Sequence, residues 1–219
     1  MKRRSRGVFV IVFLLLVTVI VFAVVMKLYH KSDKTYSNSD FSIPNYKSQV
    51  DMDGDGIDDQ TDFLQNVRVY LDTKPVYKSQ YYAGGYPDDE YGVCTDVIAF
   101  GMLDAGYNLR DLVDEDIEAH PERYDIDSPD KNIDFRRVSV LKVFFDYHAI
   151  SLTRDISEIG EWQGGDIIVF EEGHIGVISD KRNEHGVPYM LHNGSPWQAS
   201  YEEDKLEGRT DIIGHYRIS

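Results

Sequence analysis

The chain has 219 residues, of which 42% are hydrophobic and 12% aromatic, and its formal net charge is −15. This length and apolar content indicate a folded domain with its own core and exclude an intrinsically disordered chain. The negative charge argues against nucleic-acid binding, which needs a basic face, and against electrostatic attachment to anionic lipid. The single cysteine excludes an intramolecular disulfide.

The N-terminal region has the pattern of a membrane anchor. Residues 1–6 are basic, and the segment 7–28 contains the uncharged run Val8–Met26, which is about the length needed to cross a bilayer. Because basic residues stay in the cytoplasm, we expect residues 1–6 to be a cytoplasmic tail and the rest of the chain to lie outside a bacterial cell membrane. The alternative is a signal peptide cleaved after Ala23.

A polar segment, residues 29–50, is expected to be a linker between the anchor and the domain. An Asp-rich loop, residues 51–62, follows it and has the spacing of an EF-hand-type calcium loop with a sharp turn at Gly56. The expected ligands are the side chains of Asp51, Asp53, Asp55, Asp59 and Asp62 and the carbonyl of Ile57. Asp62 is shorter than the usual Glu at the last position, and the alternative is a solvated turn in which Thr61 or Asp62 caps the next helix.

The only cysteine, Cys94, lies between a glycine-broken loop and a stretch with helical spacing. Apolar residues recur from Val97 to Ala105, and Gly106 follows as a stop signal, so we expect Cys94 in the first turn of a helix. The helix N-terminus favours an anion, which would make the thiol easier to ionise. The alternative interpretation of a lone cysteine is a small buried hydrophobic residue.

The remaining pattern predicts helices first and strands afterwards, an α+β domain over residues 63–219 in which N-terminal helices pack on an antiparallel sheet. Helices are expected from Phe63 to Leu71 and over Val138–His148, with a charged, irregular stretch at 108–132. Short apolar strands are expected at 167–170, 174–179, 187–192 and 212–218.

Two histidines stand at the ends of strands that a hairpin would pair. His174 opens one strand and His192 ends the next, so the two rings can become cross-strand neighbours. His174 could then face Cys94 while His192 holds its other ring nitrogen. Asn193 is the rival third member, and only one of these adjacent residues can face the site.

The chain contains, in order, the motifs Tyr81-x-x-Gly84-Gly85, Cys94, His174-Ile-Gly-Val and His192. With these motifs it resembles the NlpC-type papain-like cysteine peptidases. Within that superfamily the chain is most similar to a bacterial group known only as a domain of unknown function, marked by GVCTDVI, NIDFRR, HIGVISD and HNG. The resemblance covers residues 81–218 and implies a catalytic set of Cys94, His174 and His192. The segment around the nucleophile departs from the usual Asp-Cys-Ser-Gly.

The resemblance implies a hydrolase of amide bonds that needs no catalytic cofactor, with structural calcium as the one candidate ion. For an outward-facing bacterial domain, the expected partner is peptidoglycan, through its stem peptides. Expected substrate contacts come from Tyr81, Asp96, Arg136 and Asn193, although a surface ion pair at a helix start is an equal interpretation of Arg136. A non-catalytic module that binds the cell wall or a partner protein is the alternative function, and an acyltransferase is a third.

Overall fold

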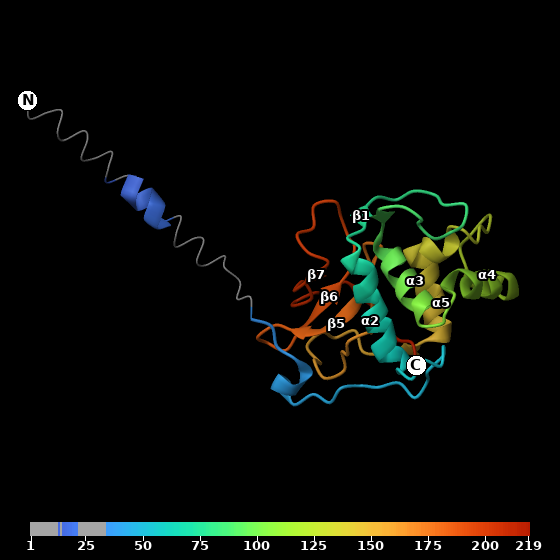
Figure 1. Ribbon diagram of the computed structural model, residues 1–219, viewed down its shortest axis with the longest axis horizontal. Helices are drawn as coiled ribbons and strands as arrows, with labels where there is room; N and C mark the ends of the chain where they lie inside the picture. Colours follow the sequence, from blue (N-terminus) through green and yellow to red (C-terminus); the bar gives the residue numbers. More distant parts are fainter. Residues whose placement is uncertain (1–12, 14, 22–33) are drawn as a thin grey trace, which may run out of the picture. The chain divides into compact units, whose positions relative to one another are not determined.

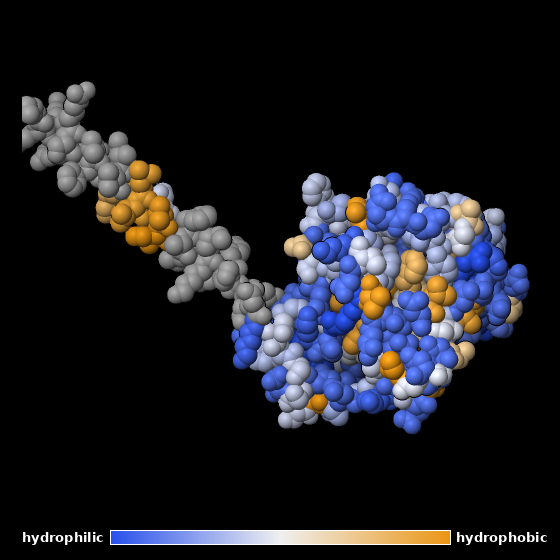
Figure 2. All heavy atoms as spheres, viewed as in Figure 1, coloured by the Kyte–Doolittle hydropathy of each residue, from blue (hydrophilic) through white to orange (hydrophobic). Residues whose placement is uncertain are grey.

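The computed structural model describes Phe13, residues 15–21 and residues 34–219, in two units, Met1–Thr35 and Tyr36–Ser219. In the first unit Phe13 and residues 15–21 are helical, exposed and, apart from Thr18, apolar (Figure 2). No helix within the described ranges is both long and apolar enough to cross a membrane. The basic tail and most of the anchor expected at 7–28 lie outside these ranges, so both stay predictions.

The second unit is an α+β domain, as the sequence predicts (Figure 1). Its helices are η1 (Asn38–Phe41), α2 (Asp59–Asp72), α3 (Cys94–Asp104), α4 (Leu109–Ala119), η2 (Pro121–Arg123), η3 (Asp134–Arg136) and α5 (Val138–His148). Its strands are β1 (Val76–Tyr77), β2 (Tyr91–Gly92), β3 (Ile150–Ser151), β4 (Ile167–Phe170), β5 (His174–Arg182), β6 (Pro188–Leu191), β7 (Glu202–Glu203) and β8 (Ile212–Arg217). The last six form an antiparallel sheet in the order β3-β8-β4-β5-β6-β7, and β1 and β2 form a short parallel pair.

One helix was missed in the stretch expected to be irregular. Helix α4 begins after Asn108, whose side chain accepts a hydrogen bond from the Asp111 backbone N–H at 3.4 Å. Its buried residues Leu109, Val113 and Ile117 are four positions apart and therefore share one face. The many charged residues between these positions made the helical spacing of the apolar residues hard to recognise in the sequence. Helix α5, by contrast, has the predicted bounds.

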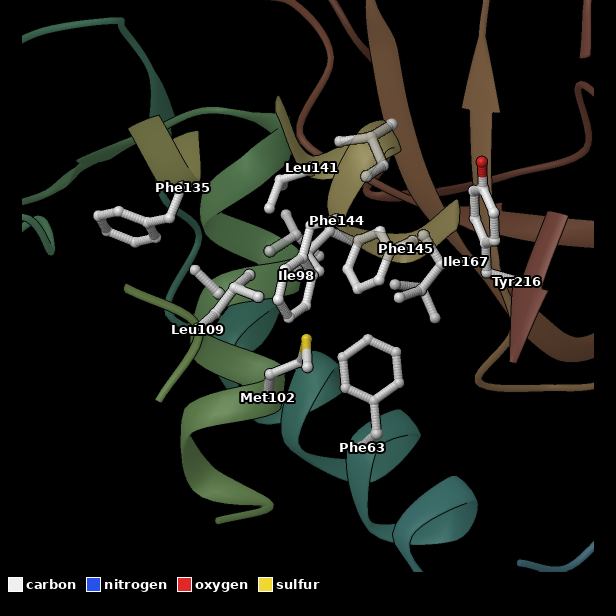
Figure 3. Packing of buried hydrophobic residues seen from close by; sticks show 14 of the residues in the cluster. Phe63, Ile98, Met102, Leu109, Phe135, Leu141, Phe144, Phe145, Ile167 and Tyr216 are labelled. Atoms are coloured by element: carbon white, nitrogen blue, oxygen red, sulfur yellow. The ribbon is translucent and has the colours of Figure 1, made fainter. Parts of the chain in front are cut away.

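The main core lies between the helices and one face of the sheet. Figure 3 shows residues from α2, α3, α5 and the sheet meeting there, including Phe63, Ile98, Phe145 and Ile167. Alternate residues of β4 point to opposite faces, so Ile167 belongs to this core and Ile168 to a second cluster on the other face. Strand β4 is thus buried on both sides, which explains its uninterrupted apolar sequence.

A buried carboxylate joins the sheet to α2. Asp166, fully buried, accepts two hydrogen bonds of 2.8 Å from Arg217, one of 3.0 Å from His215 Nε2 and one of 3.0 Å from Gln60. The preceding Gly165 has φ of +89°, and a Cβ there would lie 2.7 Å from the Gln60 carbonyl oxygen. Gly165 and Asp166 therefore serve packing and hydrogen bonding between the sheet and α2.

The segment expected to be a linker, 29–50, is from Tyr36 onward part of the folded unit. Tyr36 and Arg182 exchange backbone hydrogen bonds of 2.9 and 2.7 Å. The buried Arg182 guanidinium also donates to the Asn38 side chain at 2.6 Å, and Tyr46 donates to the Ser219 carbonyl at 2.7 Å. This expectation was wrong because the segment's partners lie more than a hundred residues away and leave no local period.

Candidate active site

Helix α3 presents Cys94 as its first residue, as predicted. Val93 is the N-cap in an extended conformation, and its backbone N–H donates to the Asp96 side chain at 2.8 Å. The apolar residues that follow, including Ile98 and Met102, are buried in the main core. Core packing of α3 therefore fixes the start of the helix, and with it the position of the sulfur.

The chain leading to Cys94 is held by Asn193. Its side-chain amide, which is buried, donates to the carbonyls of Pro75 (3.0 Å) and Gly92 (3.1 Å). Gly92 leaves room for the Tyr70 hydroxyl, which would lie 2.3 Å from a Cβ at that position. Because this amide shapes the loop, Asn193 does not take the rival role of third catalytic member, and its expected substrate contact stays a prediction.

The two predicted histidines are hydrogen-bonded to each other. His174 Nε2 lies 2.9 Å from His192 Nδ1, and His192 Nε2 lies 2.9 Å from a carboxylate oxygen of Glu203. Lys205 approaches the same oxygen at 2.7 Å. A Cβ at Gly194 would lie 2.6 Å from His192 Nδ1, so the backbone there closes over the pair.

Glu203 was missed in the sequence. It lies in a two-residue strand, β7, which is too short to show the alternation of polar and apolar residues that predicts a strand. Only the pairing of β7 with β6 brings it to His192.

Cys94 and both histidines line one pocket of about 420 Å³. Its wall consists of Tyr77, Cys94, Phe170, Glu172, Gly173, His174, Met190, His192, Gly194, Ser195, Gln198, Lys205 and Arg209. A pocket of this size holds a few residues of a peptide and lies at the lower end of ligand-site volumes. The fold thus joins the thiol from the first half of the domain to imidazoles from the second.

The Cys94 thiol is protonated at rest. Burial raises its pKa to about 11, and hydrogen bonds from the backbone of Ile175 and Thr95 offset this only in part. The expectation that the helix N-terminus makes this thiol easy to ionise was therefore wrong, because desolvation of the thiolate outweighs the N–H groups. The contact with Ile175 places the sulfur beside the residue that follows His174. No Sγ–imidazole hydrogen bond is present in residues 34–219.

The imidazoles are neutral at pH 7. Burial lowers the pKa of His174 to about 4, and the neighbouring His192, Arg209 and Lys205 contribute in the same direction, against Glu172. Burial also lowers the pKa of His192, despite its hydrogen bond to Glu203. The site at rest therefore contains a neutral thiol and two neutral bases.

Asp96 and Arg136 do not face the pocket. They form a two-pronged ion pair of 2.6 and 2.9 Å in which the exposed fractions of the side chains are 0% and 2%. Arg136 also donates to the Gln80 carbonyl at 2.8 Å. Both predicted substrate contacts are contradicted, since the guanidinium and carboxylate neutralise each other in the interior. The pair is also buried, unlike the ion pair considered as the alternative for Arg136.

Tyr81 is likewise outside the pocket. Its side chain is 57% exposed, and its hydroxyl accepts a long hydrogen bond of 3.4 Å from Asn132. Tyr77, four residues earlier, lines the pocket instead. The family-based assignment of Tyr81 is thus contradicted by this structure.

The Asp-rich loop brings together half of its expected ligands. Carboxylate oxygens of Asp51, Asp53 and Asp55 lie within 4.8 Å of one another and are exposed. Asp59 points elsewhere, because its side chain accepts hydrogen bonds from the Met52 backbone and the Tyr107 hydroxyl. The predicted ligand role of Asp59 is therefore contradicted.

The end of the loop differs from the alternative interpretation as well. The N-cap of α2 is Asp58, which accepts from the Thr61 backbone at 3.2 Å, and neither Thr61 nor Asp62 has that role. Asp62 is buried, and desolvation followed by the charges of Asp55 and Asp53 raises its pKa to about 6. Asp62 thus lies near the cluster. The backbone N–H of Ile57 donates to the Asp55 side chain at 2.8 Å, and the ligand role of the Ile57 carbonyl stays a prediction.

Comparison with known proteins places the chain in a family. Residues 64–218 match the family described as domain of unknown function DUF1287. The chain belongs to this family. It is also 34% identical over 162 residues to the uncharacterized protein YijF of Escherichia coli strain K12, an alignment that covers 70% of this chain and 77% of the relative. No solved structure matches the chain.

These findings confirm the predicted resemblance to a bacterial domain of unknown function. The family match begins inside α2 and includes Cys94, His174, His192 and Glu203. Neither comparison links the chain to the NlpC-type papain-like superfamily, so that assignment stays a prediction.

Proposed function

We propose that this domain hydrolyses amide bonds with Cys94 as the nucleophile and His174 as its general base. The observation that carries the proposal is the shared pocket, where a thiol at a helix N-terminus meets a hydrogen-bonded histidine pair. A weak nucleophile, an adjacent base and a third group that orients the base are the parts that covalent catalysis requires. The helices preceding an antiparallel sheet are consistent with the papain-like arrangement implied by the resemblance.

Because the thiol and the imidazole are both neutral, proton transfer accompanies nucleophilic attack. His174 Nε2 is bonded to His192, so Nδ1 is the nitrogen that accepts the Cys94 proton as sulfur attacks the amide carbonyl. His174 then returns this proton to the leaving amine, which departs and leaves a thioester on Cys94. Water attacks the thioester with His174 again as base, and the carboxylic acid is released.

The helix N-terminus stabilises the charge that forms during this reaction. The first backbone N–H groups of an α-helix have no intrahelical acceptor, and those of α3 begin at Cys94. The N–H of Cys94 is the nearest donor for the oxyanion of the tetrahedral intermediate. The same feature that fails to ionise the resting thiol can therefore stabilise the transition state.

Peptidoglycan stem peptides are the proposed substrate class. This proposal depends on the outward orientation expected from residues 1–28 and on the resemblance to cell-wall peptidases. The overall charge of −15 also disfavours polyanionic substrates such as nucleic acids.

The test uses the full chain, purified in detergent and incubated with peptidoglycan, with products identified by mass. Cys94→Ala and His174→Ala should each lower turnover by about a thousandfold or more. His185→Ala is the matched control, because this exposed histidine pairs with Glu207 and neither residue lines the pocket. Turnover by Cys94→Ala at the wild-type rate would contradict the proposal.

The second candidate function is a binding module on the same fold. It is favoured by the raised pKa of Cys94 and by the lack, in residues 34–219, of a bond between its sulfur and His174. This alternative expects wild-type and Cys94→Ala proteins to bind peptidoglycan fragments equally and to release no products.

We also propose calcium binding by the Asp-rich loop as a structural role. The support is the approach of the Asp51, Asp53 and Asp55 oxygens, together with the like charges around Asp62. Calcium titration by calorimetry should show heat that Asp51→Asn and Asp55→Asn abolish. Lack of heat at millimolar calcium would identify the loop as an acidic turn.

A further inference from the structure

We propose that Glu203 is a positioning residue that fixes the tautomers of both histidines and so leaves Nδ1 of His174 free to act as the base. A series of hydrogen bonds runs from Glu203 through His192 to His174. Its catalytic meaning depends on the proposed function, whereas the tautomers can be measured without any turnover.

Glu203 is negatively charged at neutral pH. Burial raises the pKa of this carboxyl, but hydrogen bonds from Lys205 and His192 outweigh burial and hold it below its usual range. Glu203 is therefore an anion at neutral pH, and an ionised carboxylate can only accept hydrogen bonds. The nitrogen of His192 that faces it, Nε2, must carry the proton.

The protonated Nε2 of His192 also determines the tautomer of His174. A neutral imidazole has one N–H and one bare nitrogen, so His192 with a proton on Nε2 offers a bare Nδ1. This Nδ1 lies 2.9 Å from His174 Nε2. The bond requires a donor, and His174 must therefore carry its own proton on Nε2. One carboxylate thus determines the tautomers of two rings.

The remaining ring nitrogen of His174, Nδ1, is then free of a proton. With its proton on Nε2, His174 has a bare Nδ1, which is the form that can accept a proton from a thiol. The opposite tautomer would have an N–H at Nδ1 and could not serve as base. Glu203 is itself only 12% exposed, which limits competition from water for the bond to His192.

The strand that carries Glu203 supplies a matched control. Adjacent strand residues face opposite sides, and Glu202 turns to Arg68 at 3.1 Å while Glu203 turns to His192. Both are part-buried glutamates on β7, and both lie in ion pairs with a lysine. Glu202→Gln therefore makes the same chemical change without touching the histidines.

The experiment is long-range ¹H–¹⁵N correlation spectroscopy of the imidazoles in the full chain at pH 7. The two histidines are assigned by loss of signals in His174→Gln and His192→Gln. We expect both wild-type rings to carry the proton on Nε2, and Glu202→Gln to leave this unchanged. In Glu203→Gln the amide can donate or accept, so we expect a mixture of tautomers or a switch on both rings.

A proton on Nδ1 of His174 in the wild type would overturn the proposal, and so would wild-type tautomers in Glu203→Gln. If that variant does not fold, the wild-type spectrum still decides. With peptidoglycan, Glu203→Gln should lower kcat by roughly 10- to 100-fold with little change in KM, whereas Glu202→Gln changes neither. A wild-type protein with the expected tautomers but no turnover would contradict the hydrolase and leave the tautomer assignment intact.

Discussion

Replacing Arg136 should lower the free energy of unfolding of the domain without weakening substrate binding. The guanidinium forms hydrogen bonds of 2.6 and 2.9 Å with Asp96, and both side chains are at most 2% exposed. Arg136→Ala leaves the Asp96 carboxylate buried without its partner, which costs about 3–5 kcal/mol. In a domain of this size, each kcal/mol lowers Tm by about 2–4 °C, so a fall of about 6–20 °C is expected.

The assay is thermal and denaturant unfolding of the full chain, followed by KM for whatever peptide substrate the wild type turns over. The exposed pair of Lys142 and Asp146, 2.7 Å apart on α5, is the control, and Lys142→Ala should change stability by about 0.3–0.5 kcal/mol. Replacing both members of the buried pair with apolar residues, Asp96→Leu with Arg136→Met, should recover much of the loss. Wild-type stability of Arg136→Ala combined with a large rise in KM would refute this reasoning and restore the substrate-binding role.

Three further predictions follow from the site. Burial raises the pKa of the Cys94 thiol from 9.0 to about 11, which lowers the thiolate fraction at pH 8 about 100-fold. Because a more basic thiolate is a better nucleophile, about tenfold of the rate is recovered, and iodoacetamide should label the native protein about tenfold more slowly than the denatured one. Faster labelling of the native protein would contradict the raised pKa. Because burial lowers the pKa of His174 from 6.5 to about 4, protons bind preferentially to the unfolded chain, and stability should fall by up to about 3 kcal/mol as pH drops from 6.5 to 4. His174→Gln should flatten that dependence in denaturant titrations, and an unchanged acid slope would assign it to other groups. Asn193→Ala should lower the free energy of unfolding by about 1–3 kcal/mol, because two buried carbonyls lose their donor, and equal stability of the variant would show that water replaces the amide.

Because Cys94 and His174 are both uncharged at neutral pH, the reactivity of this site has to be assessed differently from that of a resting thiolate. A resting thiolate would make rapid alkylation the natural criterion for a nucleophilic cysteine. With Cys94 and His174 both uncharged, slow alkylation is compatible with catalysis in which the proton moves during attack. Release of products by the wild type that Cys94→Ala no longer releases, and not labelling, therefore separates the hydrolase from the binding module.

The residues predicted best from sequence are those whose local pattern and role coincide. Cys94 is the first residue of a helix because a glycine-rich loop ends and a buried apolar period begins there. His174 and His192 meet because hairpin-linked strands must pair as neighbours. In each of these cases the information lies within about twenty residues of chain.

The substrate contacts were predicted poorly because residue type does not show which partner a side chain has. Asp96, Arg136 and Asn193 have the polar groups that a substrate site needs, but the structure uses all three to hold the loop and helix around Cys94. Tyr81 was assigned from a family pattern, and its backbone position turns the ring outward to 57% exposure. Buried polar groups need partners, and those partners lie tens of residues away in the sequence.

The sequence by itself determined the α+β order of helices and strands, the helix that begins at Cys94, and the pairing of two histidines, because each follows from short-range period and chain connectivity. Only the tertiary structure decided the charge state of the thiol and the role of Glu203. Desolvation of Cys94 depends on atoms packed around it from β5, and Glu203 reaches His192 through a strand too short to have a pattern. Electrostatic environment is a property of the assembled interior, and a linear sequence does not contain its distances.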